Sequence, residues 1–531
     1  MNALTGTGVL VRLAVRRDRI VLPAWIAVFV LMAVGSAAAT IPLYPSLASR
    51  VQAAETINGA QSMVALYGRI YDPASIGALA LVKMSGFGAA LVAVLAIFTV
   101  VRHTRAEEAS GRQELLGAAT VGRSAPLTAA LLLAFGASLV LAVVTGLGLI
   151  AAGLPADGSF AFGLALGGIG AAFAAVAALV AQLTASARTA IRTAVAVLGA
   201  VYVLRAIGDT AGQTGPQWLT WLSPIGWSQQ LRPFAGNRWW VASIMIAFSV
   251  VVTAGAYVLA ARRDTGAGLI PDRPGRAAAV PGLSGPLALA WRLHRGLLSG
   301  WLIGFVLLGL VFGNLASSVG SFFDSPQARD MIIALGGEKG LIDAFVTAEL
   351  ALVATMASVY GIQAVMRMRA EETHLLAEPI LATPTSRTRW AGSHLVIAIL
   401  GSTLLMAVMG TAAGLAHGAQ TGDMAQVGRL LGAALAHMPA IWVLIGITVA
   451  AFGLLPRLIA AGWVALTGFF LIGELGPLFQ LKEWVIDLSP FAHVPRLPGG
   501  AFEPMPLALL AGLAALLAIA GLAGFRRRDI S

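Results

Sequence analysis

Long apolar stretches, separated by short polar segments, make up most of this chain. A helix needs about 20 apolar residues to cross a hydrocarbon layer of ~30 Å, and most of the stretches approach or exceed that length. We therefore predict an all-α polytopic membrane protein with about 12 transmembrane helices. The predicted spans are residues 20–40, 81–101, 127–151, 160–183, 194–207, 240–261, 297–316, 350–366, 395–415, 430–455, 458–472 and 507–524.

The pattern of the first half recurs in the second half. LAVRRDRIVLPAWIAVFVL at 13–31 aligns without gaps on LAWRLHRGLLSGWLIGFVL at 289–307, and the Leu-Ser-Pro at 222–224 recurs at 488–490. Because each half holds an even number of spans, both cross the membrane in the same sense, which predicts two parallel six-helix pseudo-repeats. We assign residues 1–263 to the first half, 264–286 to a cytoplasmic linker and 287–531 to the second half.

A polar loop is duplicated between the second and third spans of each half. RAEEASGRQELLGAATVGR at 105–123 and RAEETHLLAEPILATPTSR at 369–387 share their charged positions. Loops usually vary in sequence. A charged loop that occurs twice in a largely hydrophobic chain therefore predicts a surface that binds a specific partner. A solvated loop with internal ion pairs is the alternative. The matched residues are Arg105, Glu107, Glu108, Glu114 and Arg123 in the first loop, and Arg369, Glu371, Glu372, Glu378 and Arg387 in the second.

Composition excludes several classes of protein. With 58% hydrophobic and 11% charged residues, the composition excludes a soluble globular protein. The net charge of +11 comes from basic residues in short loops, which predicts cytoplasmic N- and C-termini rather than nucleic-acid binding. The absence of cysteine excludes thiolate chemistry, and the 7 histidines show no close metal-ligand pairing, so we predict no metal site. The excess of arginine over lysine is typical of high-GC bacteria and favours a bacterial plasma (inner) membrane.

The second set of candidate residues lies near the predicted outer face. Proline disfavours helix at the preceding residue, so each Leu-Ser-Pro predicts a break before the last span of its half. The aromatic residues beside the breaks form either an interfacial belt or a lid over a translocation path. Charged residues at the outer ends of spans are either paired at the membrane edge or part of that path. The candidate gate and path residues are Trp221, Pro224, Trp227, Pro490, Phe491, His493, Arg205 and Glu474, with Asp209 as the pairing partner of Arg205.

The two polar loops resemble the first cytoplasmic loop of type-two ABC exporter permeases. The second copy keeps Pro384, Ser386 and Arg387 of that pattern, whereas the first copy matches it more loosely. The fusion of two such halves is similar to the permeases of tetronasin-type polyketide-antibiotic exporters. The resemblance implies that the ten matched loop residues couple the chain to two copies of a separate ATPase subunit, and that the substrate is a hydrophobic or amphipathic compound.

The chain itself lacks the residues for ATP hydrolysis. A phosphate-binding loop needs a Gly-Lys pair followed by Ser or Thr, and this sequence contains no Gly-Lys pair. We therefore expect no cofactor on this chain, with ATP and magnesium held by the partner ATPase. The main alternative is a twelve-span secondary transporter driven by an ion gradient. A membrane-embedded enzyme acting on lipid is a third reading, although no nucleophile and base constellation is recognisable.

Overall fold

The computed structural model describes residues 3–111, 120–211, 215–264, 266–270, 282–283, 285–318, 337–475 and 482–529. Throughout these ranges the regular elements are helices, and none is a strand. Eleven of these helices are long and apolar enough to cross a membrane, which confirms the prediction of an all-α polytopic membrane protein. The stretch predicted as the eleventh span forms a shorter apolar helix, Ala461–Gly473.

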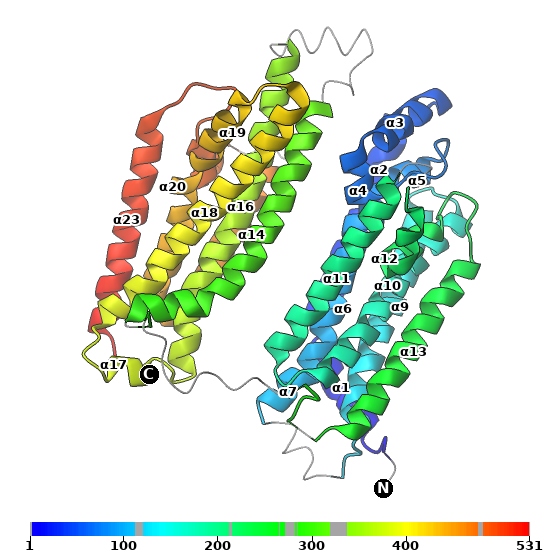
Figure 1. Cartoon of the computed structure of the whole chain (residues 1–531), viewed down its shortest axis with the longest axis horizontal. Coiled ribbons are helices and arrows are strands. Elements are labelled where there is room, and N and C mark those ends of the chain that lie inside the picture. The colour runs from blue at the N-terminus through cyan, green and yellow to red at the C-terminus, as the bar shows by residue number, and fades with distance from the viewer. Residues whose placement is uncertain are drawn as a thin grey trace. The chain divides into compact units, whose positions relative to one another are not determined.

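The chain divides into two compact units, Met1–Gly275 and Arg276–Ser531. The boundary lies within the segment 264–286, whose role as a linker stays a prediction. Unit 1 begins with the short helix α1 (Thr7–Arg17), and unit 2 begins with the long helix α14 (Pro286–Ser318). Each unit ends with a long apolar helix, α13 (Trp240–Arg262) in the first unit and α23 (Pro504–Arg527) in the second (Figure 1). The two units are described separately below.

Unit 1 is a bundle of long helices with short helices at both ends. The short elements α3, α4, α5 and α12 gather at one end of the bundle, whereas α1 and α7 lie at the other (Figure 1). Its elements are α1 (Thr7–Arg17), α2 (Val21–Leu43), α3 (Leu47–Gly59), α4 (Gln61–Tyr67), α5 (Ile76–Lys83), the π-helical turn η1 (Met84–Gly88), α6 (Ala89–His103), α7 (Arg105–Ala109), α9 (Ala125–Ala151), α10 (Ala156–Leu183), α11 (Ala187–Thr210), the 3-10 helix η2 (Gln217–Leu222), α12 (Pro224–Gln230) and α13 (Trp240–Arg262).

The helix α10 forms the centre of unit 1. It packs against α6, α9, α11 and α13 and is buried over most of its length. Small residues allow this close approach, because a Cβ added to Gly163 would lie 2.2 Å from the carbonyl oxygen of Ala142 on α9. Gly163, Gly167, Ala171 and Ala175 stand at every fourth position of α10, a spacing that predicts tight helix packing.

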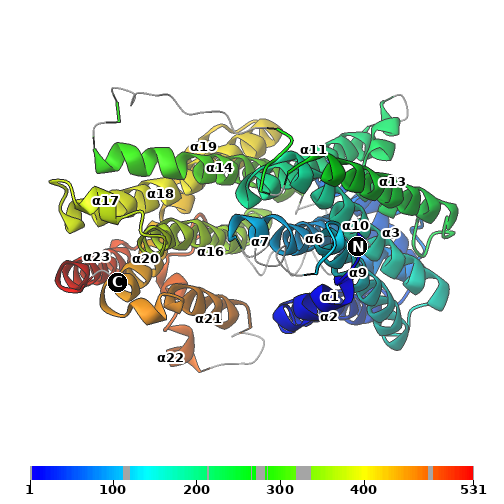
Figure 2. The same cartoon turned by 90° about the horizontal axis from the view of Figure 1, so that it is seen from below.

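Unit 2 repeats this arrangement with some differences. Its first helix, α14, is continuous where unit 1 has the pair α1 and α2, and the α18 and α16 helices pack against it (Figure 2). Its elements are α14 (Pro286–Ser318), α16 (Gly337–Thr373), α17 (Glu378–Leu381), α18 (Arg387–Thr421), α19 (Ala425–Leu435), α20 (Met438–Leu454), the 3-10 helix η4 (Pro456–Leu458), α21 (Ala461–Leu475), α22 (Glu483–Ile486), the 3-10 helix η5 (Pro490–His493) and α23 (Pro504–Arg527).

The helices α20 and α23 approach each other backbone to backbone. A Cβ added to Gly453 would lie only 1.8 Å from the carbonyl oxygen of Gly521, and one added to Gly521 would lie 2.3 Å from that of Val449. Without a hydrophobic driving force between helices in lipid, such close contact of small residues is a main source of helix association. Neither glycine can gain a side chain without separating the helices.

We predict that Gly453→Ala destabilises the protein by about 1–3 kcal/mol, because the added methyl group overpacks this contact. Thermal unfolding of the purified protein in detergent measures the effect. Gly199→Ala is the matched control, since a Cβ there meets nothing within 4 Å and alanine favours the helix. Equal unfolding temperatures for the two variants would contradict the packing described here.

Candidate functional site

The first polar loop carries a charged group that the protein encloses completely. Arg105, the first residue of α7, is 0% exposed. Its guanidinium donates to Oε2 of Glu108 at 2.6 Å and to the carbonyl oxygen of Ala267 at 2.8 Å. The same oxygen of Glu108 accepts from Nη1 of Arg263 at 2.9 Å, and Oε1 of Glu108 pairs with Nη2 of Arg263. Glu108 therefore lies between two arginines, one on its own loop and one just after the last helix of unit 1.

The second polar loop repeats this arrangement in unit 2. Glu372 is 2% exposed and lies between Arg369, whose Nη1 is 3.0 Å from Oε2, and Arg528, whose Nη2 is 2.8 Å from the same oxygen. Arg528 directly follows α23, as Arg263 directly follows α13. The same ion-pair geometry thus joins the polar loop of each unit to the end of its last helix.

The closing arginine of each loop strengthens this connection. Arg123 donates to the carbonyl oxygen of Arg263 at 2.5 Å, and Arg387 donates to that of Arg528 at 2.6 Å. A cation at the last carbonyls of a helix is also favoured by the helix dipole. We call these two sets the base clamps. The first clamp is Arg105, Glu108, Arg123 and Arg263, and the second is Arg369, Glu372, Arg387 and Arg528.

The neighbouring carboxylates also point inward. Glu107 pairs with Arg17 on α1. Glu371 is 4% exposed, and its Oε1 accepts from Nε of Arg367 at 3.0 Å. Buried carboxylates need such partners because desolvation penalises an unpaired charge. In this arrangement, the carboxylates of Glu108, Glu371 and Glu372 form internal ion pairs, and the coupling role expected from the sequence stays a prediction.

The exposed part of the second loop lies around α17. Leu375 and Leu376 are 59% and 58% exposed, and Glu378 and Pro384 are exposed as well. Leu375 and Leu376 thus present two adjacent apolar side chains on the exposed side of the loop. We call Leu375, Leu376 and Glu378 the loop face. The corresponding Glu114 of the first loop lies outside the described residues.

Sequence reasoning missed one arginine of each clamp. In the sequence alone, Arg263 and Arg528 are only two of the basic residues whose distribution predicts the orientation of the chain. The available signal was positional, since each follows the final span of its half. Their pairing with Glu108 and Glu372 could not be read from spacing along the chain, because the partners are separated by four helical spans.

The predicted gate residues of unit 1 pack within their own unit. Pro224 begins α12 after the extended residue Ser223, as the Leu-Ser-Pro pattern predicts for a break. Trp227 donates from Nε1 to the carbonyl oxygen of Trp221 at 2.6 Å, and Trp221 stacks on Trp240 with ring centroids 5.7 Å apart. These contacts fix the tryptophans against α13.

The corresponding residues of unit 2 differ in exposure. Pro490 begins η5 and is buried, Phe491 packs against the apolar core, and His493 is exposed with Nε2 2.8 Å from the carbonyl oxygen of Asp487. The side chain of Glu474 lies outside the described residues. A gate would combine residues of both units, so it stays a prediction.

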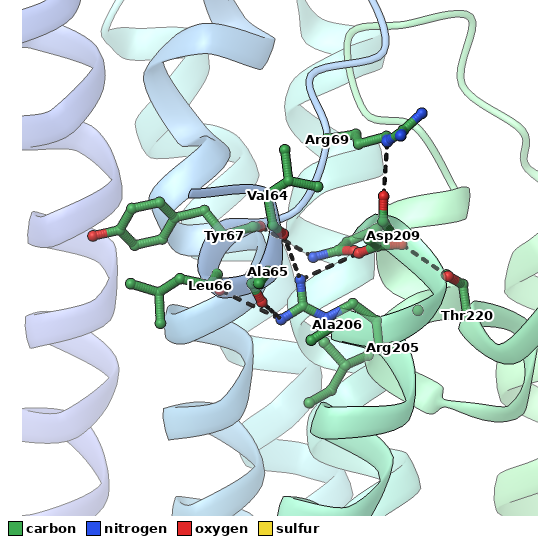
Figure 3. A network of polar contacts seen from close by, with 12 residues as sticks. Val64, Ala65, Leu66, Tyr67, Arg69, Arg205, Ala206, Asp209 and Thr220 are labelled. Carbon is green, nitrogen blue, oxygen red and sulfur yellow. Dashed lines mark hydrogen bonds and ion pairs between the residues drawn. The ribbon is translucent and has the colours of Figure 1, made fainter. Parts of the chain in front are cut away.

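The expected pair of Arg205 and Asp209 is present and belongs to a larger network (Figure 3). Nη1 of Arg205 is 3.2 Å from Oδ2 of Asp209, and Nη2 donates to the carbonyl oxygen of Ala65 at 2.7 Å. Oδ1 of Asp209 accepts from the hydroxyl of Thr220 at 2.8 Å. The network joins α4, α11 and η2 at this end of unit 1, and a place for Arg205 in a translocation path stays a prediction.

No cluster suited to a metal ion occurs in the part of the chain that the structure describes. The charged groups of the base clamps hold helices together, and long apolar helices make up the rest of each unit. This combination defines a polytopic membrane protein whose polar loops are tied to its membrane helices by buried ion pairs.

Comparison with known proteins identifies the family. A sequence model described as "Multidrug efflux system permease Rv1217c, C-terminal domain" matches residues 10–259 and 283–526. The "Multidrug efflux system permease protein Rv1217c" of Mycobacterium tuberculosis (strain ATCC 25618 / H37Rv) is 43% identical over 532 residues, which cover 100% of this chain and 96% of that protein. The chain therefore belongs to this family of multidrug efflux permeases. The membrane, transport and efflux predictions are confirmed, whereas the tetronasin-type and ABC type-two assignments stay predictions.

We predict that Glu372→Gln lowers the free energy of unfolding by about 3 kcal/mol, because it leaves Arg369 and Arg528 without their carboxylate. Unfolding of the detergent-purified protein measures this change. Glu378→Gln is the matched control, since Glu378 is exposed on the loop face and surface substitutions usually shift stability by under about 0.5 kcal/mol. A loss for Glu372→Gln as small as that of the control would refute the clamp.

Proposed function

We propose that this permease is the membrane subunit of an ATP-binding-cassette exporter. It would move hydrophobic or amphipathic, drug-like compounds outward across a bacterial plasma membrane. Two copies of a separate ATPase chain would hold ATP and magnesium and supply the energy, with both termini of the permease in the cytoplasm. Family membership supports efflux, and the missing Gly-Lys pair argues that the energy source lies on another chain.

The observation that carries this proposal is the occurrence of a base clamp in each half of the chain. A loop that is only solvated would move independently of the membrane helices. Each polar loop here is bound through a buried carboxylate to the arginine that follows the last span of its unit. A displacement of the loop by a bound ATPase would therefore move that span, because breaking the buried pair costs several kcal/mol.

The loop face offers the ATPase an apolar contact with a charged rim. Burial of a leucine side chain contributes about 1.5–3 kcal/mol, and Glu378 adds the possibility of a charge-assisted hydrogen bond. Internal ion pairs hold the loop in shape, so little ordering is needed on binding. The base clamps thus hold the loop against the membrane helices, and the loop face contacts the ATPase.

A second candidate function, efflux driven by a proton gradient, has one observation in its favour. His294 and His394 are buried in unit 2 with Nε2 and Nδ1 2.9 Å apart, and Nε2 of His394 is 3.7 Å from Oε2 of Glu371. Chains of ionisable groups within spans often carry protons in transporters. Efflux that stops when a protonophore collapses the gradient at constant ATP would favour this alternative.

We predict that the purified permease hydrolyses no ATP, and that co-expression with its ATPase yields one permease with two ATPase chains. Each chain carries two polar loops, one for each ATPase copy. Native mass spectrometry of the detergent-released complex measures the stoichiometry. An assembly with two permease chains would overturn the stoichiometry. ATP hydrolysis by the permease alone would overturn the proposal that the ATPase chains supply the energy.

We also predict that replacing both leucines of the loop face, Leu375→Ser with Leu376→Ser, raises the Kd for the ATPase at least roughly tenfold. The reason is the loss of apolar burial at the contact. Binding of the purified ATPase to the permease in nanodiscs measures the Kd. Leu488→Ser is the control, because Leu488 is similarly exposed, at 58%, in a different loop of unit 2. Equal Kd values for all three proteins would remove the loop face from the interface.

A further inference from the structure

Unit 1 contains an open-sided apolar cavity between α9, α10 and α13. Its volume is about 460 Å³, within the range of about 300–1,000 Å³ typical of sites for drug-sized ligands. Phe135 on α9, Gly168 on α10 and Met245 on α13 contribute to its walls. Ile246 and Val250, which are 60% and 61% exposed, lie at its open side. An apolar molecule could enter the cavity from the side.

The cavity is not a general result of the repeated fold. In unit 2, the corresponding helices α20 and α23 touch through the backbones of Gly453 and Gly521, which leaves no room between them. In unit 1, by contrast, the nearest approach to Gly168 is the flexible end of the Met245 side chain. The two halves share their base clamps but differ in how the last helix packs.

The cavity wall also carries hydroxyl groups on α13, and the equivalent positions of α23 in unit 2 have none. Ser249, Thr253 and Tyr257 follow one another at single helical turns along α13, and all three line the cavity. When the last helices are aligned on Arg263 and Arg528, the positions of these three residues in α23 are occupied by apolar side chains. Those residues are Ala514, Ala518 and Leu522.

One of these hydroxyls is left without a partner. Ser249 donates to the carbonyl oxygen of Met245 at 2.8 Å, and the Tyr257 hydroxyl is 2.7 Å from that of Thr128. The Oγ1 atom of Thr253 is enclosed and has no hydrogen bond within the described structure. An unsatisfied buried hydroxyl is unfavourable by about 1–3 kcal/mol. Because Thr253 lines the cavity, a rotation of its side chain would turn the hydroxyl toward a bound ligand, and a hydrogen-bond acceptor on that ligand would be stabilised.

We propose that this cavity binds the exported compound, an apolar and largely aromatic molecule with one hydrogen-bond acceptor directed at Thr253. The inference rests on the proposed function for the direction of transport, but binding itself needs no ATPase. A lipid acyl chain fits the cavity less well, because its tail offers nothing to the Thr253 hydroxyl. The single polar group would orient the ligand, while the apolar walls accept ligands of different shapes.

Binding of Nile red, an apolar aromatic dye with a carbonyl acceptor, tests this site. The purified permease is titrated in detergent without any ATPase, and the dye fluorescence gives the Kd. Ala171→Leu fills the cavity from α10 and should raise the Kd at least roughly tenfold, since Ala171 lines it. Ala196→Leu is the matched control, because Ala196 is exposed on α11 and does not line the cavity.

A second pair of variants tests the hydroxyl without changing the volume. Thr253→Val keeps the shape and should raise the Kd about fivefold, the equivalent of one lost hydrogen bond, whereas Thr253→Ser should restore binding. Equal Kd values for Ala171→Leu and Ala196→Leu would overturn the site. It would also be overturned if phospholipid co-purified with the wild type and was lost in Ala171→Leu while dye binding stayed unchanged. A permease that binds the dye in this way but recruits no ATPase would contradict only the proposed energy source.

Discussion

The pairing of buried charge at the base of each unit determines how the polar loops are held. Glu108 and Glu372 are almost fully enclosed, and a carboxylate in such a place is stable only between positive partners. Each finds one arginine on its own loop and one after the last helix of its unit. The requirement for charge compensation thus explains why the same residue types recur at the same spacing in both halves.

Much of the architecture follows from the sequence because long apolar runs have few alternatives in a membrane. The predicted spans agree with the helices except for the eleventh, which is shorter than a span, and Pro224 and Pro490 each follow an extended residue, as expected for a break. The direction of the loop carboxylates did not follow. Glu371 and Glu372 look like surface residues in a polar segment, and only the three-dimensional approach of Arg367 and Arg528 shows that they are buried. The pairing of Arg205 with Asp209 was predictable because both lie on one helix a turn apart, whereas the bond from Arg205 to Ala65 was not.

The two halves share one feature and differ in another. Both keep the base clamp, which suits a common task at the loops. Their last helices differ, since α23 packs on α20 backbone to backbone through glycine, while α13 packs on α10 through side chains and lines a cavity with Ser249 and Thr253. The two copies of the repeat thus keep the same ion pairs at their polar loops, while the packing of the last helix has diverged.

A double-mutant cycle on Glu108 and Arg263 tests the central claim, that a buried pair binds each polar loop to the last span of its unit. The measurement is the free energy of unfolding of the purified protein with Glu108→Gln, with Arg263→Gln and with both. The clamp predicts strong coupling, with the double variant more stable than the sum of the single losses implies by about 1–3 kcal/mol. Additive losses, with a coupling free energy near zero, would show that the two side chains act independently and would contradict the account.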